Sequence, residues 1–295
     1  MSQGQQHYWG SGKLVGGGAH VYIALLHFTM IQSLRKLFRP EPERLHPPAV
    51  PPGERIYAVG DVHGRRALFD ALVAAIERDD ACRIGARTTI ILLGDLIDRG
   101  EDSAGVITSA RALAARRDVR ILCGNHEEML LRSLDDIDAL RRFLKFGGRE
   151  TLLSYPIDQQ EWDGATMQEA QQLMRQVIPP ADIAFIRRFE DWVQCGDYLF
   201  VHAGIEPGLP LEQQTHHHLR WIRKPFLDFQ GDFGCVVVHG HTIYDEPVVL
   251  HNRIGIDTGA FMSGRLTALA LEGEDRWLME MAEVDGEFVT TSRPV

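Results

Sequence analysis

Cysteine is scarce in this chain. The 295 residues include four cysteines, Cys82, Cys123, Cys195 and Cys235, and no two of them form a CxxC pair. Without closely spaced thiols, the sequence predicts neither a zinc ribbon nor a disulfide framework. This usage is typical of a protein of the reducing cytoplasm, and we expect that location.

Long apolar runs are also lacking. The one candidate targeting segment, Val21–Ile31, contains His27 and is too short to span a bilayer. Basic residues follow it (Arg35, Lys36 and Arg39), and it has no small-residue cleavage site. The sequence therefore predicts neither a secretory signal peptide nor a membrane partner.

Positive charge is in deficit. There are 31 Lys and Arg residues against 41 Asp and Glu, a formal net charge of −10. Such a balance excludes a protein that holds nucleic acid through a broad basic surface, because that binding depends on neutralising phosphates. Small phosphorylated substrates stay compatible, since a local cluster of cations reverses the sign inside a cleft. At 44% hydrophobic residues, the composition is that of an ordinary globular protein, and one domain with an appendage is the simplest division.

The first 53 residues differ from the rest. Residues 1–29 have no clear period, and a short basic amphipathic segment begins at Met30. We expect Met30 to be the natural initiator, and a peptide from residues 1–29 in the native protein would contradict this. Six prolines between positions 40 and 53 then predict an extended linker. We expect residues 1–53 to be a flexible extension and residues 54–295 to be the catalytic domain.

From Arg55 onward, short apolar runs alternate with amphipathic stretches. The predicted strands are 56–59, 88–93, 119–122, 198–201, 235–238, 248–250, 254–256, 266–271 and 277–281, with helices near 65–78 and 103–117. This βαβαβ order predicts an α/β fold with its functional loops at the carboxyl ends of strands. Residues 127–190 are predicted to be a mostly helical insertion, broken at Gly147–Gly148 and Pro179–Pro180.

Five clusters of polar residues follow predicted strands. They are Gly60-Asp-Val-His-Gly64, Gly94-Asp-Leu-Ile-Asp-Arg-Gly100, Gly124-Asn-His-Glu127, His202-Ala-Gly204 and His239-Gly-His241. One such cluster alone is weak evidence, but five at successive strand ends would bury carboxylates and imidazoles that need partners. A pair of metal ions is the simplest partner, and mixed oxygen and imidazole ligands suit Mn, Fe, Zn or Co. Asp95 is our choice for the bridging carboxylate.

In this order, GDVHG, GDLIDRG, GNHE, HAG and GHT resemble the motifs of the calcineurin-like metallophosphoesterases. Within that superfamily they are most similar to the PPP-type serine/threonine protein phosphatases of bacterial and phage type. The similarity runs from about Arg55 to Leu271. It implies an α/β/β/α sandwich with two mixed sheets and a helical insertion.

The resemblance also implies roles for single residues. The implied metal ligands are Asp61, His63, Asp95, Asn125, His202 and His241. His126 corresponds to the general acid, Asp98 to the carboxylate that orients it, and Arg99 to an arginine that binds the substrate phosphate. A second such arginine is expected at Arg223, with Arg220 as the rival. One departure concerns Cys123, which stands where many PPP phosphatases have an arginine.

The implied activity is hydrolysis of phosphoserine or phosphothreonine in proteins by a dinuclear metal centre and a metal-bound hydroxide. Two divalent ions are implied, with Mn2+ expected and Fe, Zn, Co or Ni as alternatives. The nearest alternative is a symmetrical diadenosine tetraphosphate hydrolase. A non-catalytic phosphate-binding module is disfavoured, because pure binding does not need the proton donor His126. The partner is then a phosphorylated protein or a small phosphoester.

Three further groups are left open by the sequence. The histidines at 216–218 point in different directions along a chain, so a solvated loop is favoured over a metal site. His239 is left out of the ligand set. Asp257-Thr-Gly259 is either a loop near the site or a tight turn with an Asx-type cap.

Overall fold

The computed structural model describes residues 46–83 and 85–295. The proposed initiator Met30 and the first part of the proline-rich segment, residues 40–45, lie outside the described residues. Within that segment, residues 46–53 form no strand, yet they contact the domain. The Val50 amide donates to the Gly273 carbonyl at 3.0 Å, the Ala49 amide donates to Asp197, and Val50 is buried. The domain boundary at residue 53 stays a prediction.

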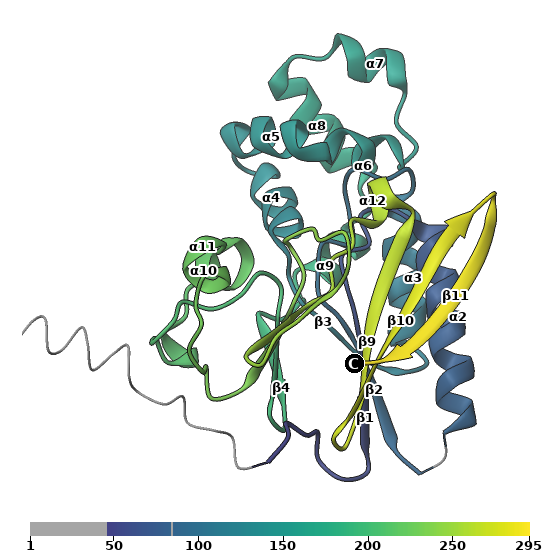
Figure 1. Ribbon diagram of the computed structural model, residues 1–295. Helices are drawn as coiled ribbons and strands as arrows, with labels where there is room; N and C mark the ends of the chain where they lie inside the picture. Colours follow the sequence, from purple (N-terminus) through teal and green to yellow (C-terminus); the bar gives the residue numbers. More distant parts are fainter. Residues whose placement is uncertain (1–45, 84) are drawn as a thin grey trace, which may run out of the picture. The chain divides into compact units, whose positions relative to one another are not determined.

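Two mixed sheets form the centre of the described domain (Figure 1). The larger has the order β11-β10-β9-β1-β2-β3, and the smaller β4-β5-β6-β8-β7. The larger consists of β1 (Glu54–Val59), β2 (Arg87–Leu92), β3 (Asp118–Ile121), β9 (Arg265–Glu272), β10 (Asp275–Val284) and β11 (Glu287–Pro294). The smaller consists of β4 (Trp192–Cys195), β5 (Tyr198–Val201), β6 (Val236–His239), β7 (Val248–Val249) and β8 (Arg253–Gly255). Strands β1, β2 and β3 are parallel, as are β5, β6 and β8, and the expected fold class is confirmed.

Alternation along the strands explains the layers. In β1, Ile56 and Ala58 belong to the apolar core shared with β6 and β8 of the other sheet, whereas Tyr57 and Val59 pack with helices. The helices against this outer face are α2 (Arg66–Cys82) and α3 (Ser103–Ala114). On the far side, Val237 packs with α10 (His216–Trp221) and α11 (Lys224–Leu227). Successive side chains of such a strand point to opposite faces of the sheet. One set therefore packs in the core between the two sheets, and the other set packs against the helices outside.

Most remaining helices gather beyond the carboxyl ends of β1, β2 and β3 (Figure 1). They are α4 (Asn125–Ser133), α5 (Ile137–Phe143), α6 (Arg149–Leu153), α7 (Gln159–Gly164) and α8 (Met167–Val177). Helix α9 (Pro180–Ile186) instead contacts α3, through the ion pair between Arg111 and Asp182. A π-helical turn at Leu144–Gly148 joins α5 to α6, and Pro180 begins α9, so both predicted breaks coincide with element boundaries. None of the helices in the described part of the chain is long and apolar enough to cross a membrane.

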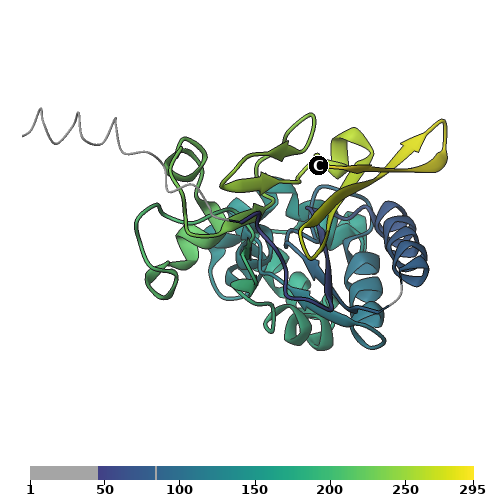
Figure 2. The same ribbon diagram turned by 60° about the horizontal axis from the view of Figure 1, so that its bottom comes forward.

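Two strands, β4 and β11, were not predicted from the sequence. All eight residues of β11 are exposed, and this strand forms the outer edge of its sheet through pairing with β10 alone. Figure 2 shows the β10–β11 hairpin extending from the sheet. Because neither side of such a strand enters a core, it lacks the apolar alternation by which strands are recognised.

Charged groups around Asp80 stabilise the end of the larger sheet at which β1 and β2 begin. Arg55, which is 1% exposed, donates to Asp80 Oδ1 at 2.8 Å, and Arg117 and Thr88 also bond this carboxylate. Burial opposes ionisation, but these three donors lower the pKa of Asp80 below its ordinary value of 3.8. The carboxylate therefore contributes stability above that ordinary pKa, and the contribution is lost as the pH falls below it.

We expect Asp80→Asn to lower the free energy of unfolding by roughly 1–3 kcal/mol at neutral pH, because Arg55 loses its buried anionic partner. The difference should be smaller at about pH 3, because that pH is below the ordinary pKa of 3.8 and the contribution of the charge is already being lost. Urea denaturation at both pH values measures this. An equal difference at both would show that the charge of Asp80 has no stabilising role.

Candidate active site

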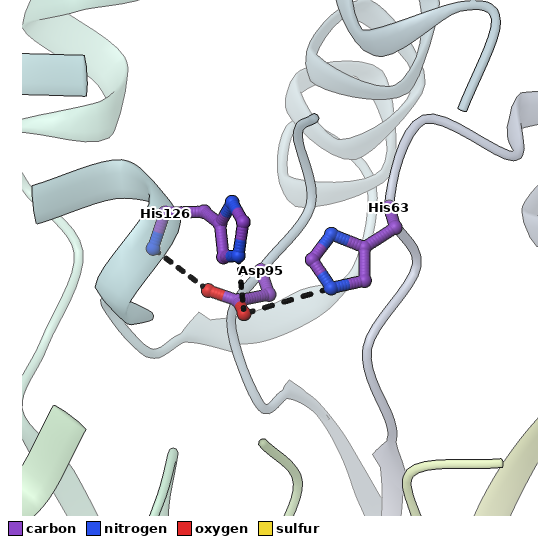
Figure 3. Close-up of side chains that lie close together, drawn as sticks. All are labelled: His63, Asp95 and His126. Carbon is purple, nitrogen blue, oxygen red and sulfur yellow. Dashed lines mark hydrogen bonds and ion pairs between the residues drawn. The ribbon is translucent and has the colours of Figure 1, made fainter. Parts of the chain in front are cut away.

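Asp95 lies at the centre of a group of buried histidines. It follows β2, whereas His63 follows β1 and His126 lies in the first turn of α4. Its Oδ2 atom is 3.7 Å from His63 Nε2, 3.8 Å from His126 Nε2 and 3.4 Å from His202 Nε2. Figure 3 shows the carboxylate between the rings of His63 and His126. The carboxyl ends of parallel strands thus bring these residues together, as the sequence predicts.

Two overlapping triads have the spacing of metal ligands. His63, Asp95 and His126 form one, and Asp95, His202 and His241 form the other, with the donor atoms of each triad within 4.8 Å of one another. Asn125 adjoins the second triad, because its Oδ1 is 3.0 Å from His202 Nε2. Asp95 belongs to both triads.

Hydrogen bonds to the backbone fix the tautomers of two histidines. His63 Nδ1 lies 2.8 Å from the Ile97 carbonyl, and His202 Nδ1 lies 2.8 Å from the Leu93 carbonyl. A carbonyl only accepts, so in both rings Nδ1 must carry the proton. The lone pair of each neutral ring is then on Nε2, which faces Asp95. This is the arrangement that orients a histidine for metal ligation.

The backbone around the site is strained. Six non-glycine residues have positive φ in the part of the chain that the structure describes, and five of them are predicted site residues. Those five are His63 (φ 45°), Asp95 (φ 48°), Asp98 (φ 74°), Arg99 (φ 69°) and His241 (φ 62°). Each such residue costs of order 1–3 kcal/mol and persists where surrounding contacts hold it, commonly at functional sites.

Two buried polar atoms at the site, each able to bind a metal ion, lack hydrogen-bond partners. These are Asp61 Oδ1 and His241 Nε2; the other carboxylate oxygen of Asp61 accepts from the His241 amide at 3.0 Å. Gly240 is needed for this approach, because a Cβ there would lie 2.0 Å from Asp61 Oδ1. Orphaned oxygen and imidazole donors beside the two triads fit divalent cations, which such mixed ligands bind.

The electrostatics of the site favour neutral rings at His63 and His241 and an ionised central carboxylate, whereas the Asp95 carboxylate raises the pKa of His202 although burial opposes this. Burial lowers the pKa of His63 to about 3 and, together with the charge of His202, that of His241 to about 2. Burial also raises the pKa of Asp61 well above its usual range, and the carboxylates of Asp257 and Asp95 raise it further. Around Asp95 the histidines outweigh burial, and the pKa of its carboxyl is held well below its usual range.

His126 forms a buried pair with Asp98. Its Nδ1 is 2.6 Å from Asp98 Oδ2, and both residues are at most 1% exposed. Although burial disfavours the charged ring, the carboxylates of Asp95 and Asp98 raise the pKa of His126 above its ordinary value. Arg99 donates to His126 Nε2 and to His63 Nε2, both at 3.0 Å, so this guanidinium bridges the two rings and opposes a proton on Nε2.

The structure separates the two rival arginines. Arg220 is held by Glu128 and Asp191, with Nη2 2.6 Å from Asp191 Oδ1. Arg223 instead points toward the site, with Nη2 3.4 Å from the His241 carbonyl, and it is exposed. This placement favours Arg223 as the cation available to an anionic ligand. Cys123 is buried, and burial raises the pKa of its thiol, so it supplies no anionic nucleophile.

Two acidic residues, Glu127 and Asp257, belong to the site although they were not among the predicted site residues. Glu127 is fully buried, and its carboxylate accepts the amides of Asp95, Leu96 and Gly124 at 2.8–2.9 Å. It thereby ties the loop after β2 to the start of α4. Burial raises the pKa of Glu127 to about 7. A glutamate at the third position of a helix, after a glycine, is the signal that identifies such a cap.

Asp257 both forms a tight turn and lies in a loop near the site, so the two interpretations of the Asp257-Thr-Gly259 motif hold together. Its Oδ1 accepts from the Gly259 amide at 2.9 Å, an Asx-type turn, and its charge also acts on Asp61. Burial raises the pKa of Asp257 to about 6. The loop continues into α12 (Ala260–Ser263), where Phe261 lies 5.4 Å from the His63 ring and 4.8 Å from the Arg99 guanidinium. In the sequence, Asp257 is marked by a predicted apolar strand that is followed directly by Asp-Thr-Gly.

The other histidines lie apart from the two triads. The loop expected at 216–218 is wrong, because these residues begin α10. His216 and His217 are exposed there, and His218 caps the helix through Thr215. His239 is buried against Phe226, and burial lowers its pKa to about 4. None of these belongs to a candidate metal cluster in the described residues.

Comparison with known proteins agrees with this geometry. The family model described as calcineurin-like phosphoesterase matches residues 54–257. A bis(5'-nucleosyl)-tetraphosphatase PrpE (asymmetrical) of Anoxybacillus flavithermus is 26% identical over 72% of this chain and 88% of its own length. Serine/threonine-protein phosphatase 1 of Salmonella typhimurium is 25% identical over 74% of this chain and 92% of its own length.

Among solved structures, that of a candidate diadenosine tetraphosphatase matches with a TM-score of 0.53. The two share 19% identity over 84% of this chain and 98% of the other, so this likeness concerns the fold alone. The family match covers more than half of the chain and includes all of the predicted metal ligands. The chain therefore belongs to the calcineurin-like phosphoesterase family and is a phosphoester hydrolase.

Proposed function

We propose that this enzyme removes phosphate from phosphoserine and phosphothreonine in proteins, using two divalent cations. The observation that carries the catalytic part of the proposal is the convergence of four imidazoles on the Asp95 carboxylate. In this proposal one cation is held by Asp61, His63 and Asp95, and the other by Asp95, Asn125, His202 and His241. Mn2+ is the first candidate.

The chemistry that such a cation pair supplies when bound is polarisation of the phosphoryl oxygen and activation of a water molecule. The chain's own residues do the rest. The Arg99 guanidinium donates to two histidine rings, and these N–H groups can donate to a phosphate oxygen instead. Arg223 supplies a second positive charge. Departure of Arg99 frees His126 Nε2 to carry a proton to the leaving oxygen, while Asp98 holds the ring from the Nδ1 side.

Cleavage of a dinucleoside tetraphosphate is the second candidate. The relative from Anoxybacillus flavithermus bears that activity in its name, whereas the relative from Salmonella typhimurium is named as a protein phosphatase. Both reactions need the same cations, phosphate-binding arginines and proton donor. The difference lies in what the cleft contacts beyond the phosphate.

A direct competition of substrates tests the proposal. Purified protein with Mn2+ is given a phosphoserine peptide, a phosphothreonine peptide and diadenosine tetraphosphate, and kcat/KM is measured for each. We expect the phosphopeptides to have the higher value. Faster release of nucleotides from diadenosine tetraphosphate would replace the first candidate with the second, and nucleotide analysis would show whether the cleavage is symmetrical. No turnover of any of the three would overturn both.

A further inference from the structure

We infer that the helical insertion acts as a positioning element for catalysis: Thr151 sets the orientation of Asp98, and Gly147 sets that of Arg99. The inference rests on the proposed function, because it assigns to the insertion the alignment of the proton donor and of the phosphate-binding arginine. Neither residue is expected to touch the substrate. Both lie about fifty positions along the chain from the residues that they hold.

Thr151, in α6, grips Asp98 at two points. Its hydroxyl oxygen accepts from the Asp98 amide at 2.8 Å and donates to Asp98 Oδ1 at 2.6 Å. With Oδ1 engaged in this way, Oδ2 is the oxygen that faces His126 Nδ1, at 2.6 Å. Thr151 is 1% exposed and Asp98 is 0% exposed, so water does not compete for these bonds. The hydroxyl thus selects the rotamer in which Asp98 supports the acid.

Ser103 completes the contact from the other side. It begins α3, and its hydroxyl also accepts from the Asp98 amide, at 2.9 Å, while lying 3.0 Å from the Thr151 hydroxyl. Two buried hydroxyls from two different helices therefore converge on one amide. Such a fully bonded polar network holds a single arrangement, since any displacement would leave a buried group unsatisfied.

Gly147 holds Arg99, the residue that follows Asp98. Its carbonyl accepts from the Arg99 amide at 3.0 Å, and its own φ is 109°, a conformation suited to glycine. A Cβ at this position would lie 2.7 Å from Arg99 Cγ and 3.0 Å from Arg99 N. The π-helical turn at Leu144–Gly148 is what brings this carbonyl against the arginine. Irregular turns of this kind recur at functional sites.

The strain of the Asp98–Arg99 pair explains why outside contacts are needed. Both residues have left-handed backbones, with φ of 74° and 69°, which side chains other than glycine rarely adopt. Hydrogen bonds from the insertion reach both amides, through Thr151 and Gly147. One segment, residues 147–151, therefore holds the acid's partner and the phosphate-binding residue together.

The test for Thr151 uses two esters that differ in their need for a proton donor. Thr151→Val removes the hydroxyl and keeps the shape. We expect kcat for phenyl phosphate, which has a poor leaving group, to fall roughly 10–100-fold, with KM changed by less than about twofold. With p-nitrophenyl phosphate, whose leaving group departs without a proton, the loss should be far smaller. Thr151→Ser should recover most of the wild-type rate.

Gly147→Ala should give a different signature. A displaced Arg99 weakens the grip on phosphate, so KM for both esters and the inhibition constant of inorganic phosphate should rise together. Thr108→Val, an exposed site on α3, is the matched control and should behave as wild type. Circular dichroism checks the fold of each variant, and Thr151→Ala serves as a second hydroxyl deletion if Thr151→Val does not fold.

The results distinguish a failure of this inference from a failure of the proposed function. An active wild type whose Thr151→Val or Thr151→Ala variant is unimpaired, or impaired equally on both esters, overturns the positioning role. Loss on phenyl phosphate alone, recovered by serine, supports it. A wild-type protein that hydrolyses neither these esters nor the phosphopeptides overturns the proposed function, and this inference with it.

Discussion

Replacing His126 by asparagine is expected to lower kcat for phenyl phosphate roughly 10²–10⁴-fold, the usual contribution of a positioned acid. His126 is buried, is paired with Asp98 at 2.6 Å, and has a pKa raised above its ordinary value. An asparagine side chain has no ionisable proton to give, so the leaving oxygen must depart as an anion. Steady-state kinetics with phenyl and p-nitrophenyl phosphate measure the effect.

The control for this variant is His217→Asn, a change of the same type on the exposed face of α10. It should leave kcat unchanged. The metal content of His126→Asn should stay close to that of the wild type if the ring serves as an acid. Loss of metal would instead make His126 a ligand of the triad that it forms with His63 and Asp95. Full activity would remove His126 from the mechanism.

Replacing Asp95 by asparagine is expected to abolish the stabilisation that Mn2+ gives the wild type. At an ion concentration about 100 times Kd, binding stabilises a folded protein by about 2.7 kcal/mol, which appears as a higher melting temperature. Asp95 is the residue shared by both triads, and the amide removes its charge. Activity should fall to that of the chelator-treated wild type.

This variant should still fold. The asparagine side chain keeps an oxygen for the His126 amide, which donates to Asp95 Oδ1 at 3.0 Å in the wild type. The charge of Asp95 raises the pKa of His202 in the wild type, so without it that ring is neutral and its Nε2 can accept from the new NH2 group. Without metal, the variant should therefore fold as the wild type does. Asp138→Asn, on the exposed side of α5, is the control, and an unchanged response of Asp95→Asn to Mn2+ would contradict the proposed centre.

The parallel strands and the site motifs were predictable because their signals are local. Each buried strand near the site is a short apolar run, and each is followed by glycine and polar residues, as in Asp61 to Gly64 after β1. Since parallel strands end at a common edge, their loops had to meet there. The closeness of His63 to Asp95, and of His202 to His241, follows from that order, whereas the meeting of the two pairs depends on the packing of the two sheets.

Groups that act through distant contacts were not predictable in this way. Thr151 is an unremarkable threonine in the sequence, and its bonds to Asp98 exist because α6 folds back over the loop after β2. Glu127 was part of a recognised motif, but its three backbone partners come from two separate loops. Likewise, Arg220 and Arg223 look alike in sequence, and only the carboxylates beside Arg220 distinguish them.

The sequence by itself determined which side chains could bind cations and where along the chain they would meet, because strand periodicity and glycine turns are short-range properties. Tertiary structure alone decided which oxygen of Asp98 faces His126, which arginine is available to a phosphate, and why five site residues tolerate left-handed backbones. Those features depend on hydrogen bonds between segments that lie far apart in the sequence. Such bonds form only when whole helices and strands pack together, and a local sequence pattern does not predict that packing.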